Sequence, residues 1–502
     1  MSSALQVSAG SHDKTPSRNR FIEFISVVLI FAGAFTFRAW PLTNIHYWDE
    51  AVYLQDAEVI CCGKTNYSDL DSRPPLISLM FTAVFLVWHH VYAAQILTAL
   101  VNAFGVVFLY LAGRLLVGRV GAGIAALLLA FGPFFISIFP PWFDSDNTGN
   151  SLLTDSPALS LLILSFWLLL LALRRPRLRR FGLIGFVFAL ACLMRFACLS
   201  NVAVLGLLIL TTEKWWKNVL ACAAGFFAGF GPYLVWSRIT YGGFFETMRR
   251  GYQYYEGARQ SPIYYLQNFG VMFGWITLAG LLLWILGFVL ERKAGLVAQG
   301  LPRWLPYYLW LWLALSIMIF FVLRHQEPRY AMPWAPPLFL LAGSGLTWLI
   351  SFQRRPARVM GTVVVTAALL ITFLPDRERF DTPFIDHSVT EEMRVAAYLD
   401  QTLPRNAIVY SNFNYPLFGY YTHLKVHELP EQGSKLYEAL AHLPSDGVLV
   451  AYTDPDIIPD PKPEWLAANP HFEPFKTFPN MTLYWYRKDA AEGVKLTVPR
   501  EP

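Results

Sequence analysis

Residues 153–180 read LTDSPALSLLILSFWLLLLALRRPRLRR, an apolar run that is followed at once by five arginines. An α-helix needs about 20 apolar residues to cross the hydrocarbon core of a bilayer, and this run has that length. Because basic residues concentrate in cytoplasmic loops, the arginines place the carboxyl end of the run in the cytoplasm. Its amino end, which carries Asp155, then lies on the outer side of the membrane.

The composition of the whole chain is also that of a membrane protein. Of its 502 residues, 55% are hydrophobic and only 15% are charged, whereas ordinary soluble domains carry roughly 25% charged residues. The basic residues form short clusters between apolar runs, as at cytoplasmic loop ends, so we predict no nucleic-acid partner. We predict a polytopic α-helical protein of about eleven spans. The spans lie at about residues 22–40, 92–113, 120–140, 153–173, 181–199, 201–212, 218–238, 268–290, 304–323, 330–350 and 359–375.

The apolar piece at residues 76–88 is too short for an ordinary span. If it crossed the membrane, the five arginines of residues 174–180 would lie outside, against the positive-inside rule. We therefore predict that it lies along the outer surface as a juxtamembrane helix. It belongs to a first outer loop that covers residues 41–91.

The chain divides into three parts. Residues 1–20 form a basic tail, which places the N-terminus in the cytoplasm. Residues 21–375 form the membrane domain. From residue 376 the composition becomes that of a soluble domain, with apolar stretches at residues 407–410, 448–452 and 482–486 that are typical of strands. An odd number of spans puts residues 376–502, a small α/β domain, on the outer or periplasmic side.

The five cysteines indicate neither a disulfide framework nor a zinc site. Cys61 and Cys62 are adjacent and are not expected to bridge each other. The other three lie in apolar runs and are predicted to be small buried residues.

The first outer loop contains the run His46-Tyr47-Trp48-Asp49-Glu50-Ala51-Val52-Tyr53. Aromatic rings are common at the headgroup level and acids are harmless in water, so the run is compatible with an ordinary interfacial loop. The alternative is a functional site, because Asp49 and Glu50 are adjacent carboxylates at the surface where the chain leaves the membrane. Other polar residues on the same face decide between the two.

Outer loops should contain few basic residues, yet two of them hold arginine pairs. One pair is Arg249 and Arg250, and the other lies in Arg324-His325-Gln326-Glu327-Pro328-Arg329-Tyr330. Guanidinium groups bind phosphate oxygens in a bidentate manner, so either segment could hold a phosphate or pyrophosphate. The alternative for each pair is snorkelling to lipid headgroups. For residues 324–330 we favour function, because polar clusters at membrane depth are commonly functional.

Asp155 opens a predicted span on the same outer face. Ordinary N-capping before Pro157 would explain it equally well.

The predicted outer face therefore carries both carboxylates and guanidiniums. A carboxylate can take a proton from an acceptor hydroxyl or amine, and cations can stabilise the charge on a phosphate leaving group. Glycosyl transfer from a lipid-linked phosphosugar needs this combination.

In their order along the chain, these residues resemble the motifs of the glycosyltransferase C superfamily. The resemblance rests on Trp48-Asp49-Glu50 after the first span, Arg73-Pro74-Pro75-Leu76, Thr154-Asp155 at the start of a span, and His325…Arg329-Tyr330…Pro333. It covers about residues 20–375. The chain looks most similar to bacterial relatives of protein O-mannosyltransferases (family 39) and of the lipid A aminoarabinose transferase (family 83).

The resemblance implies an inverting transfer from a polyprenyl-phosphate sugar on the periplasmic side of a bacterial inner membrane. It implies that Asp49 is the base and that Glu50 positions the site. Donor phosphate and acceptor would be held by the Arg73 element and the His325–Tyr330 segment; Arg73 replaces the Lys or His usual in relatives and keeps the charge. Family members differ over a bound divalent metal, and the sequence offers no convincing set of ligands for one.

Two other classes of protein fit parts of the sequence. A transporter or flippase of a lipid-linked sugar would also need outer cations, but it requires polar residues through the depth of the bundle. The predicted spans are nearly bare of Asp and Glu, which favours chemistry at one face. A membrane scaffold would leave the acidic pair without a role. The acceptor stays open among lipid A, another glycan, a protein and a membrane lipid.

Overall fold

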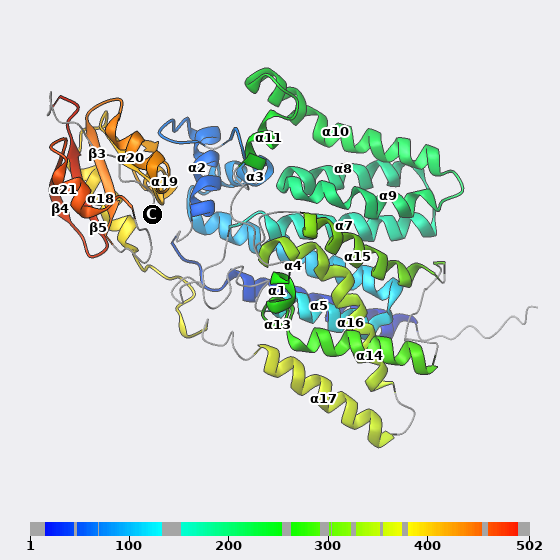
Figure 1. Ribbon diagram of the computed structural model, residues 1–502. Coiled ribbons are helices and arrows are strands. Elements are labelled where there is room, and N and C mark those ends of the chain that lie inside the picture. Colours follow the sequence, from blue (N-terminus) through cyan, green and yellow to red (C-terminus); the bar gives the residue numbers. More distant parts are fainter. Residues whose placement is uncertain are drawn as a thin grey trace, which may run out of the picture.

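Within the described residues, each apolar run that was predicted to span the membrane lies in a helix, or in two consecutive helices, of the computed structural model (Figure 1). The predicted span at residues 120–140 is described only as far as residue 132. The structure describes residues 16–44, 48–68, 70–132, 152–253, 263–291, 301–302, 304–322, 328–351, 355–373, 380–453 and 460–489. The helices of the bundle are α1 (Pro16–Ala39), α4 (Val91–Leu116), α5 (Gly118–Phe131), α7 (Asp155–Arg174), α8 (Leu178–Met194), η1 (Phe196–Asn201), α9 (Val202–Leu210), α10 (Trp215–Tyr241), α12 (Tyr264–Gln267), α13 (Phe269–Phe273), α14 (Trp275–Glu291), η2 (Leu305–Tyr307), α15 (Tyr308–Val322), η3 (Pro328–Trp334), α16 (Ala335–Ile350) and α17 (Arg355–Phe373).

Within the described part of the chain, five helices are long and apolar enough to cross a membrane: Phe21–Ala39, Val91–Leu116, Asp155–Arg174, Trp215–Tyr241 and Arg355–Thr372. The remaining apolar helices of the bundle are shorter. Large apolar side chains such as Leu29 and Val235 stay exposed on the outside of the bundle, as expected on a surface that faces lipid. The structure therefore agrees with a polytopic helical membrane domain, and the number of spans stays a prediction.

The bundle contains helix pairs that pack through glycine. On α8, an added Cβ at Gly185 would lie 1.9 Å from the Cys222 carbonyl oxygen of α10, and at Gly225 of α10 it would lie 1.9 Å from the Gly182 oxygen of α8. Only glycine permits backbones to approach this closely. Small residues are common at helix–helix contacts in membrane proteins for this reason.

One predicted span is interrupted. The run at residues 268–290 contains α13 and α14, which are separated at Gly274, where φ is +77°. A residue with positive φ cannot continue a right-handed helix, and glycine adopts this conformation without a Cβ clash. The apolar pattern alone did not reveal this break.

Three further helices lie at the end of the bundle nearest the C-terminal sheet: α2 (Trp48–Cys62), α3 (Leu76–Phe85) and α11 (Glu246–Gln253) (Figure 1). The apolar piece that was predicted as a juxtamembrane helix is α3, so its helical structure is confirmed. Asp49 and Glu50 lie in the first turn of α2, where the helix dipole favours negative charge.

The C-terminal part is an α/β domain around a five-stranded sheet of order β2-β1-β3-β5-β4. Strands β1, β2 and β3 are parallel, whereas β5 runs antiparallel to β3 and to β4. Its elements are α18 (Glu391–Thr402), β1 (Ile408–Ser411), α19 (Tyr415–Tyr421), β2 (Lys425–Glu428), α20 (Ser434–Ala441), β3 (Gly447–Tyr452), α21 (Pro463–Ala468), β4 (Phe472–Thr477) and β5 (Met481–Tyr486). The three predicted strands are β1, β3 and β5.

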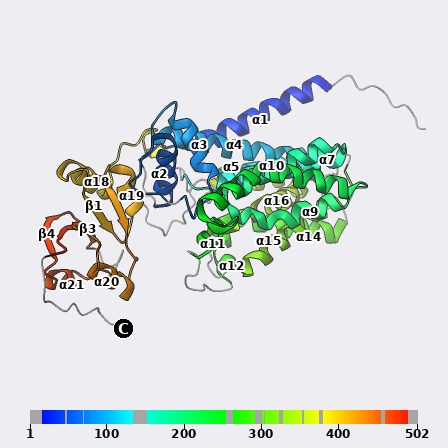
Figure 2. The ribbon, with the colours of Figure 1, turned by 90° about the horizontal axis from the view of Figure 1, so that it is seen from above.

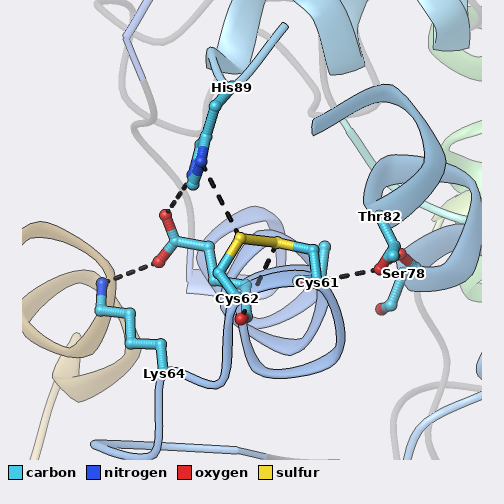
Figure 3. Close-up of a disulfide and its surroundings, with 8 residues drawn as sticks. Cys61, Cys62, Lys64, Ser78, Thr82 and His89 are labelled. Carbon is cyan, nitrogen blue, oxygen red and sulfur yellow. Dashed lines mark hydrogen bonds and ion pairs between the residues drawn. A yellow bond between two sulfur atoms is a disulfide. The ribbon is translucent and has the colours of Figure 1, made fainter. Parts of the chain in front are cut away.

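The expectation about the adjacent cysteines was wrong. Cys61 and Cys62 form a disulfide at the carboxyl end of α2 (Figure 3). The helix ends there, at Gly63 with φ +69°, and the last turn of a helix has fewer backbone hydrogen bonds to hold it. The bridge lies beside His89, whose Nδ1 is 3.9 Å from the Cys62 sulfur.

Candidate functional site

Asp49 lies between two guanidinium groups that come from distant parts of the chain. Its Oδ1 is 3.2 Å from Nη2 of Arg73, and its Oδ2 accepts a hydrogen bond of 2.6 Å from Nη1 of Arg329. All three side chains are about 15% exposed. Three motifs of the predicted site therefore meet at one carboxylate, although Asp49 and Arg329 are 280 residues apart in the sequence.

Arg73 lies in the segment between α2 and α3, just before Pro74 and Pro75. Proline fixes its own φ and restricts the residue before it to extended backbone, so this segment is stiff. The Arg73 guanidinium lies over the ring of Trp48, 5.0 Å from its centroid, and such cation–π contacts hold the group in place. Trp48 and Asp49 are neighbours in α2, so one helical turn contacts Arg73 twice.

Tyr330 connects Arg329 to a second ion pair. The Arg329 guanidinium is 5.8 Å from the Tyr330 ring centroid, and Arg195 lies 5.0 Å from the same ring. Arg195 in turn forms a hydrogen-bonded ion pair with Asp155. Asp155 is almost fully buried, and a buried carboxylate needs such a partner.

Asp155 is not simply a capping residue. The N-cap of α7 is Thr154, whose side chain makes no capping hydrogen bond, and Asp155 is the first helical residue. Its carboxylate contacts Arg195, at the end of α8, so it joins two helices at the outer end of the bundle. Asp155 is therefore not the N-cap of α7, and its substrate-binding role stays a prediction.

The Glu50 side chain contacts a different part of the chain from that of its neighbour Asp49. It is 3% exposed, and its Oε1 accepts a hydrogen bond of 2.6 Å from the Leu152 amide. Leu152 immediately precedes the start of α7. Glu50 therefore holds the segment just before Asp155, and its positioning role in a reaction stays a prediction.

Two residues of this cluster were missing from the predicted site: Tyr53 and Arg195. Tyr53 follows Asp49 by one helical turn, a spacing that places both side chains on one face. Burial raises the pKa of the Tyr53 phenol to about 12, against the opposing effects of Arg73 and of a hydrogen bond with Thr154. The i, i+4 spacing from Asp49 could have identified Tyr53. Arg195 lies near the outer end of an apolar run, which is compatible with snorkelling or with facing a cavity, so the sequence left its role open.

Arg249 and Arg250 form a separate group on α11. Arg249 pairs with Glu246 at 2.6 Å, and Arg250 pairs with Asp71 at 2.7 Å and with Glu246 at 3.1 Å. Hydrogen bonds from both arginines lower the pKa of the Glu246 carboxyl to about 2. Arg250 thereby contacts the segment that carries Arg73. The phosphate-binding role of Arg249 and Arg250 stays a prediction.

Arg324 and His325, the other members of the predicted segment, lie outside the described residues. In the part of the chain that the structure describes, no group of three or more His, Cys, Asp and Glu side chains is placed to hold a metal ion.

Comparisons with known proteins agree with this arrangement. Residues 72–236 match the model of the family described as dolichyl-phosphate-mannose-protein mannosyltransferase. A search of curated protein sequences gave no match.

Two groups of solved structures share the fold. The crystal structure of ArnT from Cupriavidus metallidurans bound to undecaprenyl phosphate aligns with a TM-score of 0.61 and 14% identity, over 95% of this chain and 100% of ArnT. The oligosaccharyltransferase AglB from Archaeoglobus fulgidus, in complex with an inhibitory peptide and a dolichol-phosphate, aligns with a TM-score of 0.57 and 13% identity, over 87% of this chain and 70% of AglB. Together, the family match and the shared fold confirm that this chain resembles the glycosyltransferase C superfamily of membrane enzymes.

Proposed function

We propose that this protein is an integral-membrane glycosyltransferase that moves a sugar from a polyprenyl-phosphate donor to an acceptor. The reaction takes place at the periplasmic face of a bacterial plasma membrane, with the N-terminus in the cytoplasm and the C-terminal domain outside. The observation that carries the proposal is the carboxylate of Asp49 between the guanidiniums of Arg73 and Arg329. The titles of the similar structures, with undecaprenyl phosphate in ArnT and a dolichol-phosphate in AglB, support this class of donor.

The two arginines suit a phosphate that carries a sugar and a polyprenyl chain. Guanidinium groups prefer the bidentate geometry of phosphate oxygens. An arriving donor phosphate competes with Asp49 for Arg73 and Arg329, and this competition releases the carboxylate. The same event therefore binds the donor and frees the base.

In the transfer step, Asp49 accepts the proton of an acceptor hydroxyl or amine. The acceptor oxygen or nitrogen forms a bond to the anomeric carbon while the bond from that carbon to the phosphate oxygen breaks, with inversion. The leaving group is polyprenyl phosphate, whose developing negative charge Arg73 and Arg329 stabilise. Glu50 holds the Leu152 backbone, and the pair of Asp155 and Arg195 keeps Tyr330 against Arg329.

The position of the charged groups favours transfer over transport. Asp49, Arg73, Asp155, Arg195 and Arg329 all belong to one contact network at the end of the bundle that carries α2. A flippase needs polar groups along the whole path through the bilayer. A polar cluster at a single face is the arrangement that a transferase requires.

The proposal is tested with the purified protein in proteoliposomes that contain a polyprenyl-phosphate sugar fraction and envelope extract as acceptor. We expect the sugar to leave the donor and to appear, by mass spectrometry, on an acceptor lipid, glycan or protein. Movement of intact donor between leaflets without any loss of its sugar would instead support a flippase and contradict the proposal.

A further inference from the structure

Helix α2 is shared between the membrane domain and the C-terminal domain. It begins at Trp48 and Asp49, in the candidate site, and ends at Cys62. Figures 1 and 2 both show α19 of the C-terminal domain beside α2. Contacts at two places hold the two helices together.

The first contact is aromatic and lies next to the candidate base. Tyr415, the first residue of α19, meets the Trp48 ring edge-to-face at 5.6 Å and 84°. Tyr67 meets Tyr415 from another side at 5.5 Å. Since Arg73 lies over Trp48 and also pairs with Asp49, direct contacts lead from the C-terminal domain to the candidate base.

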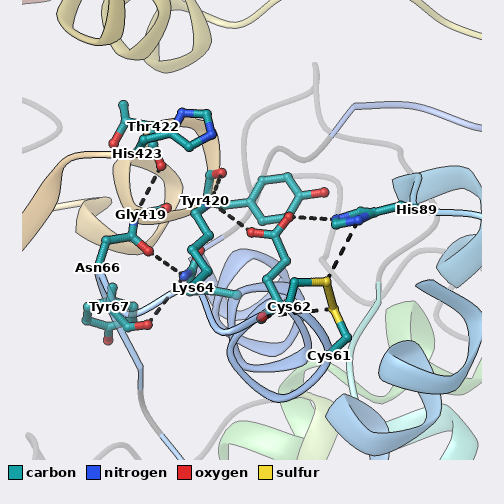
Figure 4. A network of polar contacts seen from close by, with 12 residues as sticks. Cys61, Cys62, Lys64, Asn66, Tyr67, His89, Gly419, Tyr420, Thr422 and His423 are labelled. Atoms are coloured by element: carbon teal, nitrogen blue, oxygen red, sulfur yellow. Dashed lines mark hydrogen bonds and ion pairs between the residues drawn. A yellow bond between two sulfur atoms is a disulfide. The ribbon is translucent and has the colours of Figure 1, made fainter. Parts of the chain in front are cut away.

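The second contact is polar and lies beyond the other end of α2 (Figure 4). The Lys64 ammonium donates to the Tyr420 carbonyl at 2.6 Å and pairs with Glu58 of α2 at 2.8 Å. The Asn66 amide donates to the carbonyls of Gly419 at 2.6 Å and Thr422 at 3.1 Å. These carbonyls lie at the end of α19, where the helix itself supplies no donor.

Asn66 also connects this contact back to α2. Its Oδ1 accepts a hydrogen bond of 2.8 Å from the fully buried Gln55, and its backbone oxygen accepts one of 3.2 Å from Val426 in β2. An added Cβ at Gly419 would lie 3.0 Å from the Tyr67 Cβ. The two domains therefore meet at a close and hydrogen-bonded interface, whereas a flexibly attached domain would make few such contacts.

We propose that the C-terminal domain is a fixed part of the catalytic apparatus, in which Tyr415 positions Trp48 and thereby holds Arg73 and Asp49 in place. The proposal rests on the proposed function for the identity of the cluster that is positioned. An α-helix transmits displacement along its axis because it is stiff. Holding α2 at its start and beyond its end therefore restricts the geometry of the Asp49 carboxylate.

The test compares variants of the full-length protein in nanodiscs, with undecaprenyl phosphate as the probe ligand. Tyr415→Ala removes the ring, Tyr415→Leu keeps apolar volume, and Tyr415→Phe keeps the ring. A matched control is Tyr398→Ala, in the same domain, whose ring contacts Phe478 and Lys476. Two readouts are recorded: the Kd for the probe, and hydrogen–deuterium exchange of the backbone amides of residues 48–55.

For Tyr415→Ala and Tyr415→Leu we expect Kd to rise about threefold to tenfold, the range that an aromatic pair contributes. Amide exchange in residues 48–55 should become faster in both variants. Tyr415→Phe should restore both readouts, and Tyr398→Ala should change neither. If Tyr415→Ala does not fold, Tyr415→Leu gives the same comparison.

Unchanged affinity and unchanged exchange in the Tyr415→Leu protein would overturn the proposal. Equal effects of Tyr415→Leu and Tyr398→Ala would also overturn it, because general destabilisation of the domain would then explain both. The exchange measurement needs no substrate. If the unaltered protein binds no undecaprenyl phosphate, the proposed function fails, while exchange in residues 48–55 still tests the positioning by Tyr415.

Discussion

At the scale of single residues, the central feature is the competition for Arg73 and Arg329. Both guanidiniums contact Asp49 in the structure. In the proposed function, a donor phosphate replaces that carboxylate, so binding of the donor and release of the base are coupled. The proposal thereby accounts for why the acid and the two arginines lie together although their segments are far apart in sequence.

Replacing Arg329 by alanine should weaken binding of undecaprenyl phosphate. Charge-assisted hydrogen bonds contribute about 1.5–3 kcal/mol, which corresponds to a loss of about 10- to 100-fold in affinity. Titration of the protein in nanodiscs measures this loss. Arg405→Ala, at an exposed position of the C-terminal domain, is the control and should leave the Kd unaltered.

Arg249→Ala in the same titration tests the other predicted phosphate site. A larger loss of affinity for Arg249→Ala than for Arg329→Ala would contradict our assignment.

The buried phenol of Tyr53 should not titrate in the working range of the enzyme. Its pKa is raised to about 12 by burial, so the phenol stays neutral as the pH rises past the ordinary tyrosine value of about 10. Tyr53→Phe should therefore lower transfer without changing the shape of the pH–rate profile between about pH 8 and 10. A basic limb near the ordinary tyrosine value that disappears in Tyr53→Phe would show that the phenol ionises and would refute this account.

At the scale of elements, the bundle depends on close helix pairs. Gly225 of α10 faces the backbone of α8, whereas a Cβ at Gly123 of α5 meets nothing within 4 Å. Gly225→Ala should thus destabilise the protein by about 1–3 kcal/mol through overpacking. Gly123→Ala, the matched control, should be neutral or slightly stabilising because alanine favours helix. Thermal unfolding in detergent compares the two, and equal melting temperatures would contradict this packing.

The helices of the bundle were largely predictable because they coincide with apolar runs, which can be recognised without any knowledge of tertiary contacts, whereas the polar helices α2 and α11 were not predicted. Strands β2 and β4 were not predicted. β2 reads Lys425-Val426-His427-Glu428, with one buried residue, and β4 contains Pro474 and Lys476. Both lie at the edges of the sheet, where strands tolerate charge and proline and so lose the apolar pattern.

At the scale of the whole molecule, the account requires the two ends of α7 to lie on opposite sides of the membrane. Asp155 and Arg174 are separated by the length of a 20-residue helix, about 30 Å. A cysteine introduced by Arg177→Cys should react with a membrane-impermeant maleimide only after the cells are lysed. A cysteine introduced by Lys435→Cys, on the exposed surface of the C-terminal domain, should react when only the outer membrane is permeabilised. The reverse pattern would invert the orientation and remove the site from the periplasm.

The sequence indicated which residues lie together better than it indicated how they pair. Asp49, Arg73, Asp155, Arg329 and Tyr330 lie in one contact network, and their roles stay predictions. The side-chain pairings depend on how α2, α7, α8 and η3 pack, and no local pattern encodes that packing. The contact between Tyr415 and Trp48 could not be predicted for the same reason. It joins two domains, and no local sequence pattern indicates which of their residues meet.

The most direct test of the central claim is replacement of Asp49 by asparagine, which preserves the shape of the side chain and removes its charge. Cells that lack their own copy receive the unaltered protein, Asp49→Asn, or the control Asp381→Asn at an exposed position, and their envelope lipids and glycoproteins are compared by mass spectrometry. General-base catalysis contributes about 10²–10⁴-fold, so Asp49→Asn should form at least about 100-fold less product, while Asp381→Asn should retain transfer. Purified Asp49→Asn should bind undecaprenyl phosphate at least as tightly as the unaltered protein, because the arginines no longer pair with a carboxylate. Full transfer by Asp49→Asn would contradict the account.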